Sequence, residues 1–291
     1  MTDVHAGWYL VAYDNEVPEG VAPLKLGGRR LMTVRKAGRV RVFDASCPHR
    51  GAHLGYGGKL DGDCIECPFH GRRIALGDQE QGKRKSVAEH HAHLLSGMLF
   101  VRLTSDHDAD LGFEATILRY AEERTLVPMV HAHLPTSTRM IMENGFDAEH
   151  FTALHRMPGF DWFTWASSET GEIAVTAKFG ARVPGTFYLR AFSPTLVVSE
   201  LRMPQRTQVI ITGTVPETDG CTMRIGFAVP PQDEALIPQW HRMTHIGLEQ
   251  DRLVWDHIDE SAPTDLSKAD SFVQGFWEFC EKFPTIEGGR R

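Results

Sequence analysis

The chain has 291 residues, of which 42% are hydrophobic and 24% charged, a globular composition with room for two domains or one large one. Its formal net charge of −7 argues against a nucleic-acid surface, because phosphates are bound by an excess of cations. No apolar segment approaches the roughly 20 residues of a membrane-spanning helix, and the N-terminal segment lacks the basic start of a signal peptide. Five cysteines, an odd number without the spacing of a disulfide framework, favour a cytoplasmic location.

Residues 8–105 are predicted to form short β-strands broken by turns. Strand-like runs occupy Trp8–Tyr13, Leu31–Arg35, Val40–Asp44 and Gly97–Leu103, and turn segments such as NEVPEG and KAGR follow or join them. This pattern predicts a small antiparallel all-β domain that can hold loops rigidly.

Two Cys-plus-His pairs stand inside this region, in the stretch CPHRGAHLGYGGKLDGDCIECPFH. The first pair is Cys47 with His49, the second is Cys67 with His70, and glycines and prolines around each pair favour tight turns. Two thiolates and two imidazoles can hold a [2Fe–2S] cluster in which one iron takes the sulfurs and the other the nitrogens. The sequence therefore predicts an iron–sulfur site.

Two alternatives remain open from the residues alone. A structural zinc ion also takes two cysteines and two histidines, although its first pair is usually spaced C-x2-C or wider. Cys64 stands three residues before Cys67 and is an alternative ligand, but only Cys67 has the C-x2-H spacing with His70.

The segments CPHRGAHL and GDCIECPFHG resemble the Rieske domains of oxygenase components. The resemblance implies that Cys47, His49, Cys67 and His70 bind a [2Fe–2S] cluster. It also implies an all-β Rieske domain, which we assign to residues 1–110.

Two further features of this domain are interpreted as surface. The basic run Gln81–Lys85 is expected to be solvated, with docking of an acidic electron donor as the alternative. His90, His91 and His93 fall together, but no carboxylate or cysteine accompanies them at ligand spacing. We therefore expect these three histidines to be ordinary surface residues.

A second group of potential metal ligands follows a polar connector and a predicted helix at Phe113–Glu123. Glu143, Asp147 and His150 recur at intervals of four and three, so on a helix they share one face. His155 follows His150 by five residues, about 140° further round a regular helix. For both imidazoles to meet one metal, the helix must widen into a π-bulge or end between them. Two imidazoles and one carboxylate form the facial triad of non-haem Fe(II) sites.

Residues 171–230 alternate strand-like runs with turns and predict an antiparallel sheet, which needs helices on one face to bury it. The candidates are the segment around His150, a long helix at Glu234–Ile258 and a helix at Phe272–Phe283. The predicted class is α+β, and the resemblance to oxygenase components implies that the all-β domain is followed by a helix-grip catalytic domain over residues 111–291.

The long helix offers the missing carboxylate. Asp251 lies near an apolar stripe that includes Leu248 and Trp255, where a carboxylate without a cation would be costly. Asp251 is therefore preferred as the third metal ligand, and Asp256 and Asp259 are the alternatives.

The second group resembles the motif N-x2-D-x2-H-x4-H of Rieske non-haem iron oxygenases, matched by Asn144, Asp147, His150 and His155. The resemblance implies that His150, His155 and Asp251 bind a mononuclear Fe(II). It further implies that Asp147 bridges His70 of one subunit and His150 of the next, in a ring of subunits taken as a homotrimer. The segment GWYLVAYDNEVPEG is similar to the steroid 9α-hydroxylase and cholesterol 7-desaturase group, which implies an apolar polycyclic or natural-product-like substrate.

These features together predict a terminal oxygenase component that activates O2 and oxidises its substrate, most simply by hydroxylation. The sequence lacks a Gly-rich nucleotide fingerprint, so NAD(P)H is expected to be oxidised by a separate reductase, with or without a ferredoxin. The alternative is a non-catalytic Rieske electron carrier fused to a domain that binds hydrophobic ligands.

Overall fold

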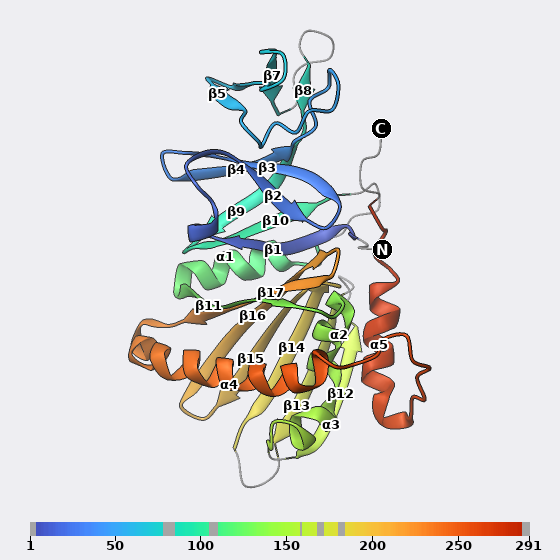
Figure 1. Ribbon diagram of the computed structural model, residues 1–291. Helices are drawn as coiled ribbons and strands as arrows, with labels where there is room; N and C mark the ends of the chain where they lie inside the picture. The colour runs from blue at the N-terminus through green and yellow to red at the C-terminus, as the bar shows by residue number, and fades with distance from the viewer. Residues whose placement is uncertain are drawn as a thin grey trace.

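The computed structural model describes residues 4–77, 85–104, 110–157, 159–167, 172–179 and 184–286. Three β-sheets follow one another along the long axis of the molecule, with helices around the lowest of them in the view of Figure 1. Most of the basic run Gln81–Lys85 lies outside the described residues.

The N-terminal part holds two sheets, with strand orders β1-β10-β9-β4-β3-β2 and β5-β6-β7-β8. Their strands are β1 (Gly7–Tyr13), β2 (Gly20–Leu26), β3 (Arg29–Lys36), β4 (Arg39–Asp44), β5 (Lys59–Asp61), β6 (Cys64–Glu66), β7 (Arg73–Leu76), β8 (Ser86–Val87), β9 (Glu89–Leu95) and β10 (Met98–Leu103). The four strands expected in this part are confirmed as β1, β3, β4 and β10, with small shifts at their ends.

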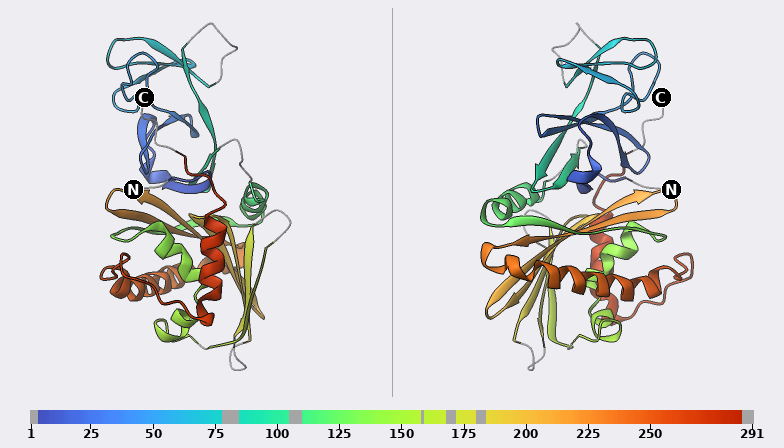
Figure 2. Two further views of the ribbon diagram at one scale, coloured as in Figure 1. Left: turned by 90° about the vertical axis from the view of Figure 1, so that its right-hand side faces the viewer. Right: turned by 60° about the vertical axis from the view of Figure 1, so that its left-hand side comes forward.

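The C-terminal part is built on a seven-stranded antiparallel sheet with the order β11-β17-β16-β15-β14-β13-β12. Its strands are β11 (Thr125–Leu134), β12 (Phe160–Ser167), β13 (Ile173–Phe179), β14 (Thr186–Ser193), β15 (Leu196–Met203), β16 (Arg206–Glu217) and β17 (Gly220–Val229). The helix α4 (Ile237–Trp255) lies across one face of this sheet (Figure 2). The expected α+β class, with an all-β part followed by a helix-gripped antiparallel sheet, is confirmed.

The α-helices are α1 (Phe113–Glu123), α2 (Thr138–Glu143), α3 (Ala148–Ala153), α4 (Ile237–Trp255) and α5 (Ser271–Cys280), and the 3-10 turns are η1 (Asp14–Glu16), η2 (Asn144–Phe146), η3 (Pro231–Leu236) and η4 (Lys268–Asp270). The helix predicted at Phe113–Glu123 is confirmed as α1. The long helix begins later than expected, because residues 231–236 form η3, and it ends at Trp255.

Strand β1 joins the N-terminal and C-terminal parts, and its seven residues are all buried. Trp8 and Leu10 pack into the large core of the seven-stranded sheet, whereas Tyr9 and Val11 pack into the core of the N-terminal sheet. Alternate side chains of a strand point to opposite faces, so a strand covered on both sides needs an unbroken apolar run. The sequence GWYLVAY provides that run.

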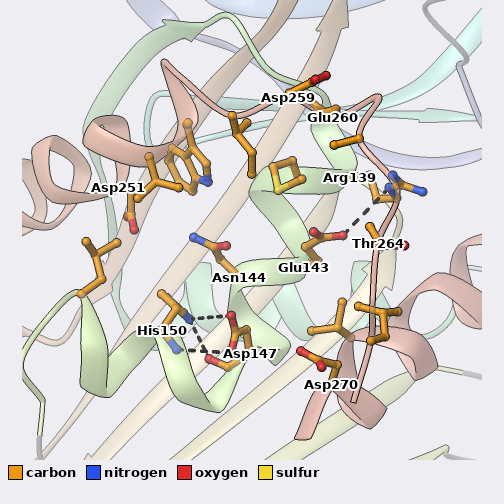
Figure 3. Close-up of a pocket in the computed structure, with 18 of the residues that line it drawn as sticks. Arg139, Glu143, Asn144, Asp147, His150, Asp251, Asp259, Glu260, Thr264 and Asp270 are labelled. Atoms are coloured by element: carbon orange, nitrogen blue, oxygen red, sulfur yellow. Dashed lines mark hydrogen bonds and ion pairs between the residues drawn. The ribbon is translucent and has the colours of Figure 1, made fainter. Parts of the chain in front are cut away.

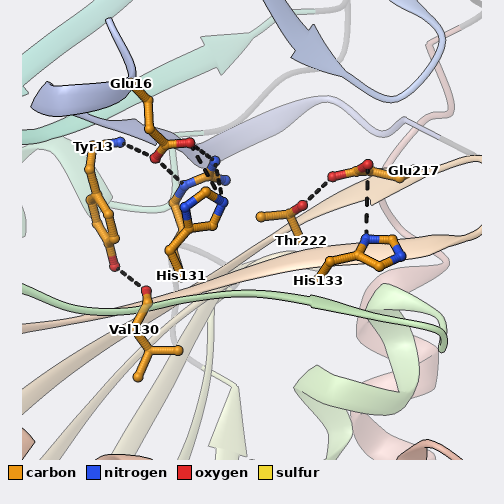
Figure 4. Close-up of polar contacts among 8 residues, drawn as sticks. Tyr13, Glu16, Val130, His131, His133, Glu217 and Thr222 are labelled. Atoms are coloured by element: carbon orange, nitrogen blue, oxygen red, sulfur yellow. Dashed lines mark hydrogen bonds and ion pairs between the residues drawn. The ribbon is translucent and has the colours of Figure 1, made fainter.

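A polar network closes the same junction (Figure 4). Arg224 of β17 donates two hydrogen bonds to Glu16 of η1, at 2.7 and 3.1 Å. The Tyr13 main-chain N–H donates to Glu16 at 2.7 Å, and its hydroxyl donates to the Val130 carbonyl of β11 at 2.7 Å. Burial by itself would raise the pKa of Glu16, but the hydrogen bonds and charge of Arg224 outweigh it, so the pKa lies below its ordinary value of 4.5.

Replacing Glu16 by Ala is expected to lower the free energy of unfolding by about 2–3 kcal/mol, because it leaves the charge of Arg224 buried without its partner. Since the folded-state pKa of Glu16 is depressed, its contribution is present at neutral pH and is lost as the pH falls below about 4.5. Urea unfolding at pH 7 and pH 4 measures both effects. The control is Glu19→Ala, which removes an exposed carboxylate 3.8 Å from Arg35 and should cost under about 0.5 kcal/mol.

Candidate functional site

The two loops that carry the Cys-plus-His pairs have the same backbone pattern. The carbonyl of Cys47 accepts a hydrogen bond from the Gly51 N–H at 2.8 Å, and the carbonyl of Cys67 accepts one from the Gly71 N–H at 2.9 Å. Gly51 and Gly71 have φ of 70° and 63°, a conformation that glycine adopts without steric cost. The glycine-rich sequence therefore builds two equivalent turns, each presenting one cysteine.

The side chains of these loops divide into an inner and an outer pair. Cys47 and Cys67 are buried and interact with each other, and burial raises the pKa of the Cys47 thiol. The rings of His49 and His70 lie outside, with centroids 4.8 Å apart. No three of these four donors lie within 4.8 Å of one another, although all belong to the described chain. The ligands of one zinc ion would converge more closely, so the geometry fits a cluster with sulfur on one iron and nitrogen on the other.

The second group does not lie on one regular helix, and the expectation that Glu143, Asp147 and His150 share a helix face is wrong. Helix α2 ends at Glu143, η2 follows, and α3 starts after Asp147. Asp147 Oδ1 accepts hydrogen bonds from the main-chain N–H groups of Glu149 and His150, at 2.9 and 3.2 Å. Asp147 is thus the N-cap of α3, a position that aspartate favours and that breaks the helix.

A π-bulge or a helix end between His150 and His155 was expected to let the two rings converge. The structure has the helix end, because α3 stops at Ala153. The rings of His150 and His155 lie with centroids 5.2 Å apart. His155 Nε2 lies 3.1 Å from Asp251 Oδ1 of α4. The donor atoms of these three residues lie within 4.8 Å of one another.

In His150 and His155, the ring nitrogen that points away from the shared centre makes a hydrogen bond, and this bond fixes the orientation of the imidazole. His150 Nδ1 donates to the main-chain carbonyl of Asp147 at 2.6 Å, and His155 Nδ1 donates to Gln250 Oε1 at 2.9 Å. Each Nε2 is then left with its lone pair directed at the shared centre, the tautomer that binds a metal. Gln250 was not identified from the sequence, because no spacing pattern indicates that the glutamine before Asp251 contacts His155.

Two further observations fit a cation at this centre. Asp251 Oδ1 is buried, and its nearest polar neighbour is His155 Nε2 at 3.1 Å. Burial lowers the pKa of His150, which keeps its imidazole neutral. Contact with Asp251 raises the pKa of His155, and a carboxylate that meets two imidazoles is the donor set that suits Fe(II).

The other candidate carboxylates lie elsewhere. Asp256 is the C-cap of α4 and pairs with Arg252 at 3.3 Å, while Asp259 accepts hydrogen bonds from Ser261. Cys64 belongs to β6 and not to the core cluster that contains Cys47 and Cys67.

A cavity of about 460 Å³ lies between α4 and the seven-stranded sheet, with His150, His155 and Asp251 in its wall. Its lining is mainly apolar and aromatic, and includes Phe151, Phe187, Ile210, Ile225, Phe227 and Trp240. Size and lining match the usual sites of small apolar ligands, which hold only a few polar groups.

A second cavity, of about 560 Å³, opens on the other side of His150 and Asp251 (Figure 3). Asp147 lies in its wall, and so does Glu143, whose Oε2 accepts a hydrogen bond from Trp277 Nε1 at 2.6 Å. Burial raises the pKa of Glu143, and the hydrogen bond from Trp277 ties its carboxylate to α5. Asn144, His150 and Asp251 line both cavities.

Comparison with known proteins agrees with this geometry. Residues 7–93 match the family described as Rieske [2Fe-2S] domain. Over 67 residues, 22% of this chain, it is 51% identical to a cholesterol 7-desaturase of Xenopus laevis, of which 15% is covered. Over 68% of the chain it is 29% identical to the aminopyrrolnitrin oxygenase PrnD of Pseudomonas fluorescens, of which 60% is covered. The chain thus spans less than two thirds of either relative.

The fold extends the likeness to almost the whole chain. The structure of dicamba monooxygenase bound to 3,6-dichlorosalicylic acid superposes with a TM-score of 0.71 and 15% identity, covering 96% of each chain. In the described residues no helix combines the length and apolar character needed to cross a membrane.

Proposed function

We propose that this chain, which carries a Rieske [2Fe-2S] domain, is the terminal oxygenase component of a multicomponent enzyme of the Rieske oxygenase family. The observation that carries the proposal is the convergence of His150, His155 and Asp251 in the wall of a mainly apolar cavity. A non-catalytic electron carrier would have no use for two imidazoles and a carboxylate that converge in the wall of that cavity.

We propose these three residues as the ligands of a mononuclear Fe(II), and Cys47, His49, Cys67 and His70 as the ligands of the [2Fe–2S] cluster. When bound, the two metal centres supply single-electron transfer and the activation of O2. The Asp147 carbonyl and Gln250 hold the imidazoles in their metal-binding orientation, and the aromatic wall excludes water from the substrate.

We propose that electrons reach this site from the cluster of a neighbouring subunit in a homotrimer. His70 is exposed at the tip of its loop, and Asp147 is partly exposed beside the second cavity. Both side chains are therefore accessible to another subunit. The carboxylate of Asp147 would accept from the imidazole N–H of the neighbouring His70, while the main-chain carbonyl of Asp147 orients His150. Residues 1–110 then form the electron-relaying domain, and residues 111–291 form the catalytic domain.

The proposed substrate is an apolar polycyclic or natural-product-like molecule, which the mainly apolar cavity of about 460 Å³ supports. Two relatives bear names that refer to cholesterol and aminopyrrolnitrin, both ring compounds. Hydroxylation is the reaction we favour. The proposed electron donors are a separate reductase and, in some systems, a ferredoxin, because the sequence carries no nucleotide fingerprint.

Iron analysis tests the proposal directly. Protein reconstituted anaerobically should hold about three irons per chain, two in the cluster and one at the mononuclear site. A value of two, with a normal cluster spectrum, would instead support the electron carrier, and a colourless zinc protein would contradict both readings.

Dependence on a partner is a second expected result. The purified protein with NADH and O2 should not oxidise any substrate, and addition of a reductase with a matching ferredoxin should restore oxidation. Chromatographic detection of oxidised product, with NADH consumption measured in parallel, checks both halves. Turnover with NADH alone would show that the multicomponent proposal is wrong.

A further inference from the structure

A second cluster of two histidines and one carboxylate lies far from the proposed iron site, where β9 of the N-terminal sheet meets α1 (Figure 1). His91 and His93 alternate on β9, so their side chains share one face, and Glu114 lies in the first turn of α1. The Nε2 atoms of the histidines are 3.1 Å apart, and Glu114 Oε1 lies 3.0 Å from His91 and 2.8 Å from His93. The three donor atoms form a nearly equilateral triangle.

Protons cannot satisfy all three sides of this triangle. If both Nε2 atoms carry a hydrogen, both can donate to Glu114, but the two N–H groups then face each other at 3.1 Å. If one Nε2 is unprotonated, it accepts from the other histidine and turns its lone pair toward the carboxylate. A cation at the centre resolves the conflict, because all three atoms can direct lone pairs at it.

The surroundings hold the donors in place. The Trp8 ring contacts both imidazoles, with centroids 5.4 Å from His91 and 5.9 Å from His93. The indole N–H of Trp8 donates to Asp110, which also accepts from the Glu114 main-chain N–H at 3.4 Å. A buried tryptophan thus orients two ligands and, through Asp110, the start of the helix that carries the third.

We propose that His91, His93 and Glu114 bind a divalent first-row metal ion such as Zn²⁺, which ties the N-terminal sheet to α1. Donor atoms about 3 Å apart, at metal distances of roughly 2.0–2.2 Å, subtend angles of about 90° and leave other positions to water. His91 is partly exposed and lines a small pocket of about 220 Å³ that does not include His93 or Glu114. The proposed role is therefore structural and does not depend on the proposed oxygenase function. The expectation that these histidines are ordinary surface residues is replaced by this proposal.

Zinc binding by the full chain with its cluster intact tests the site. Equilibrium dialysis against Zn²⁺, followed by elemental analysis, should show one more zinc ion per chain in the unmodified protein than in Glu114→Gln. If the variant still binds this zinc ion, its affinity for Zn²⁺ should be at least tenfold weaker. Differential scanning calorimetry should show a Zn²⁺-dependent rise of Tm that the variant lacks. The cluster spectrum reports whether the variant is folded, and His91→Asn, at a more exposed position, serves as a second variant.

The matched control is the double variant His241→Asn and His245→Asn. His241 is exposed and His245 partly exposed, and their Nε2 atoms are 3.2 Å apart. Among the described residues they form no group with a carboxylate, so they would bind zinc only weakly. The double variant should keep both the zinc ion and the Tm response. Equal zinc content and equal Tm response in the unmodified protein, Glu114→Gln and His91→Asn would overturn the proposal.

Discussion

Replacing Asp251 by Ala is expected to remove the mononuclear iron and abolish substrate oxidation, while the [2Fe–2S] spectrum stays unchanged. Asp251 is the only carboxylate grouped with His150 and His155 among the described residues. Two imidazoles alone hold Fe(II) weakly. The loss of iron affinity should therefore exceed the roughly 10- to 100-fold loss that follows when a residue that only orients a ligand is changed. Iron content falling from about three to two per chain, together with product analysis, measures the result.

Asp256→Ala is the matched control, because it removes a carboxylate one and a half turns further along the same segment. Asp256 is 3.3 Å from Arg252 and caps α4, so its loss should affect stability slightly and leave the iron content unchanged. If Asp256→Ala loses the iron and Asp251→Ala keeps it, the assignment of the third ligand is wrong. His150→Ala should also lose the mononuclear iron and substrate oxidation while keeping the cluster spectrum.

The sequence predicted most of what depends on local patterns. The buried run of β1 and the amphipathic α1 are visible as periodicity, and the two cysteine loops are visible as glycine and proline at fixed offsets. The α+β class followed from the order of these elements. Such features depend on residues near one another in the chain, so one sequence is enough to find them.

The contacts between distant segments were beyond this kind of analysis. Gln250 lies 95 residues from His155, and Glu114 lies 21 from His93, with no spacing that marks either pair. The break at Asp147 was also missed, because the same spacing suits a helix face and an N-cap. Local capping by the Asp147 side chain fixes the break.

Replacing Asp147 by Asn is expected to keep both metals and slow the transfer of electrons to the mononuclear site by about 10- to 100-fold. The fold should survive, because asparagine is as good an N-cap as aspartate and can accept the same hydrogen bonds from Glu149 and His150. The orientation of His150 should survive too, since its Nδ1 donates to the main-chain carbonyl of residue 147 and not to the side chain. Only the negative charge facing the second cavity is removed.

Single-turnover kinetics separate this role from a structural one. Protein with a reduced cluster and bound substrate is mixed with O2, and the rate of cluster reoxidation is followed by absorbance. Glu149→Gln, which removes an exposed carboxylate from the same turn of α3, should react at the unmodified rate. Asp147→Asn changes neither the N-cap of α3 nor the orientation of His150. If its cluster is reoxidised at the same rate as that of Glu149→Gln, electrons do not pass by Asp147. The bridge between subunits would then have to be sought elsewhere.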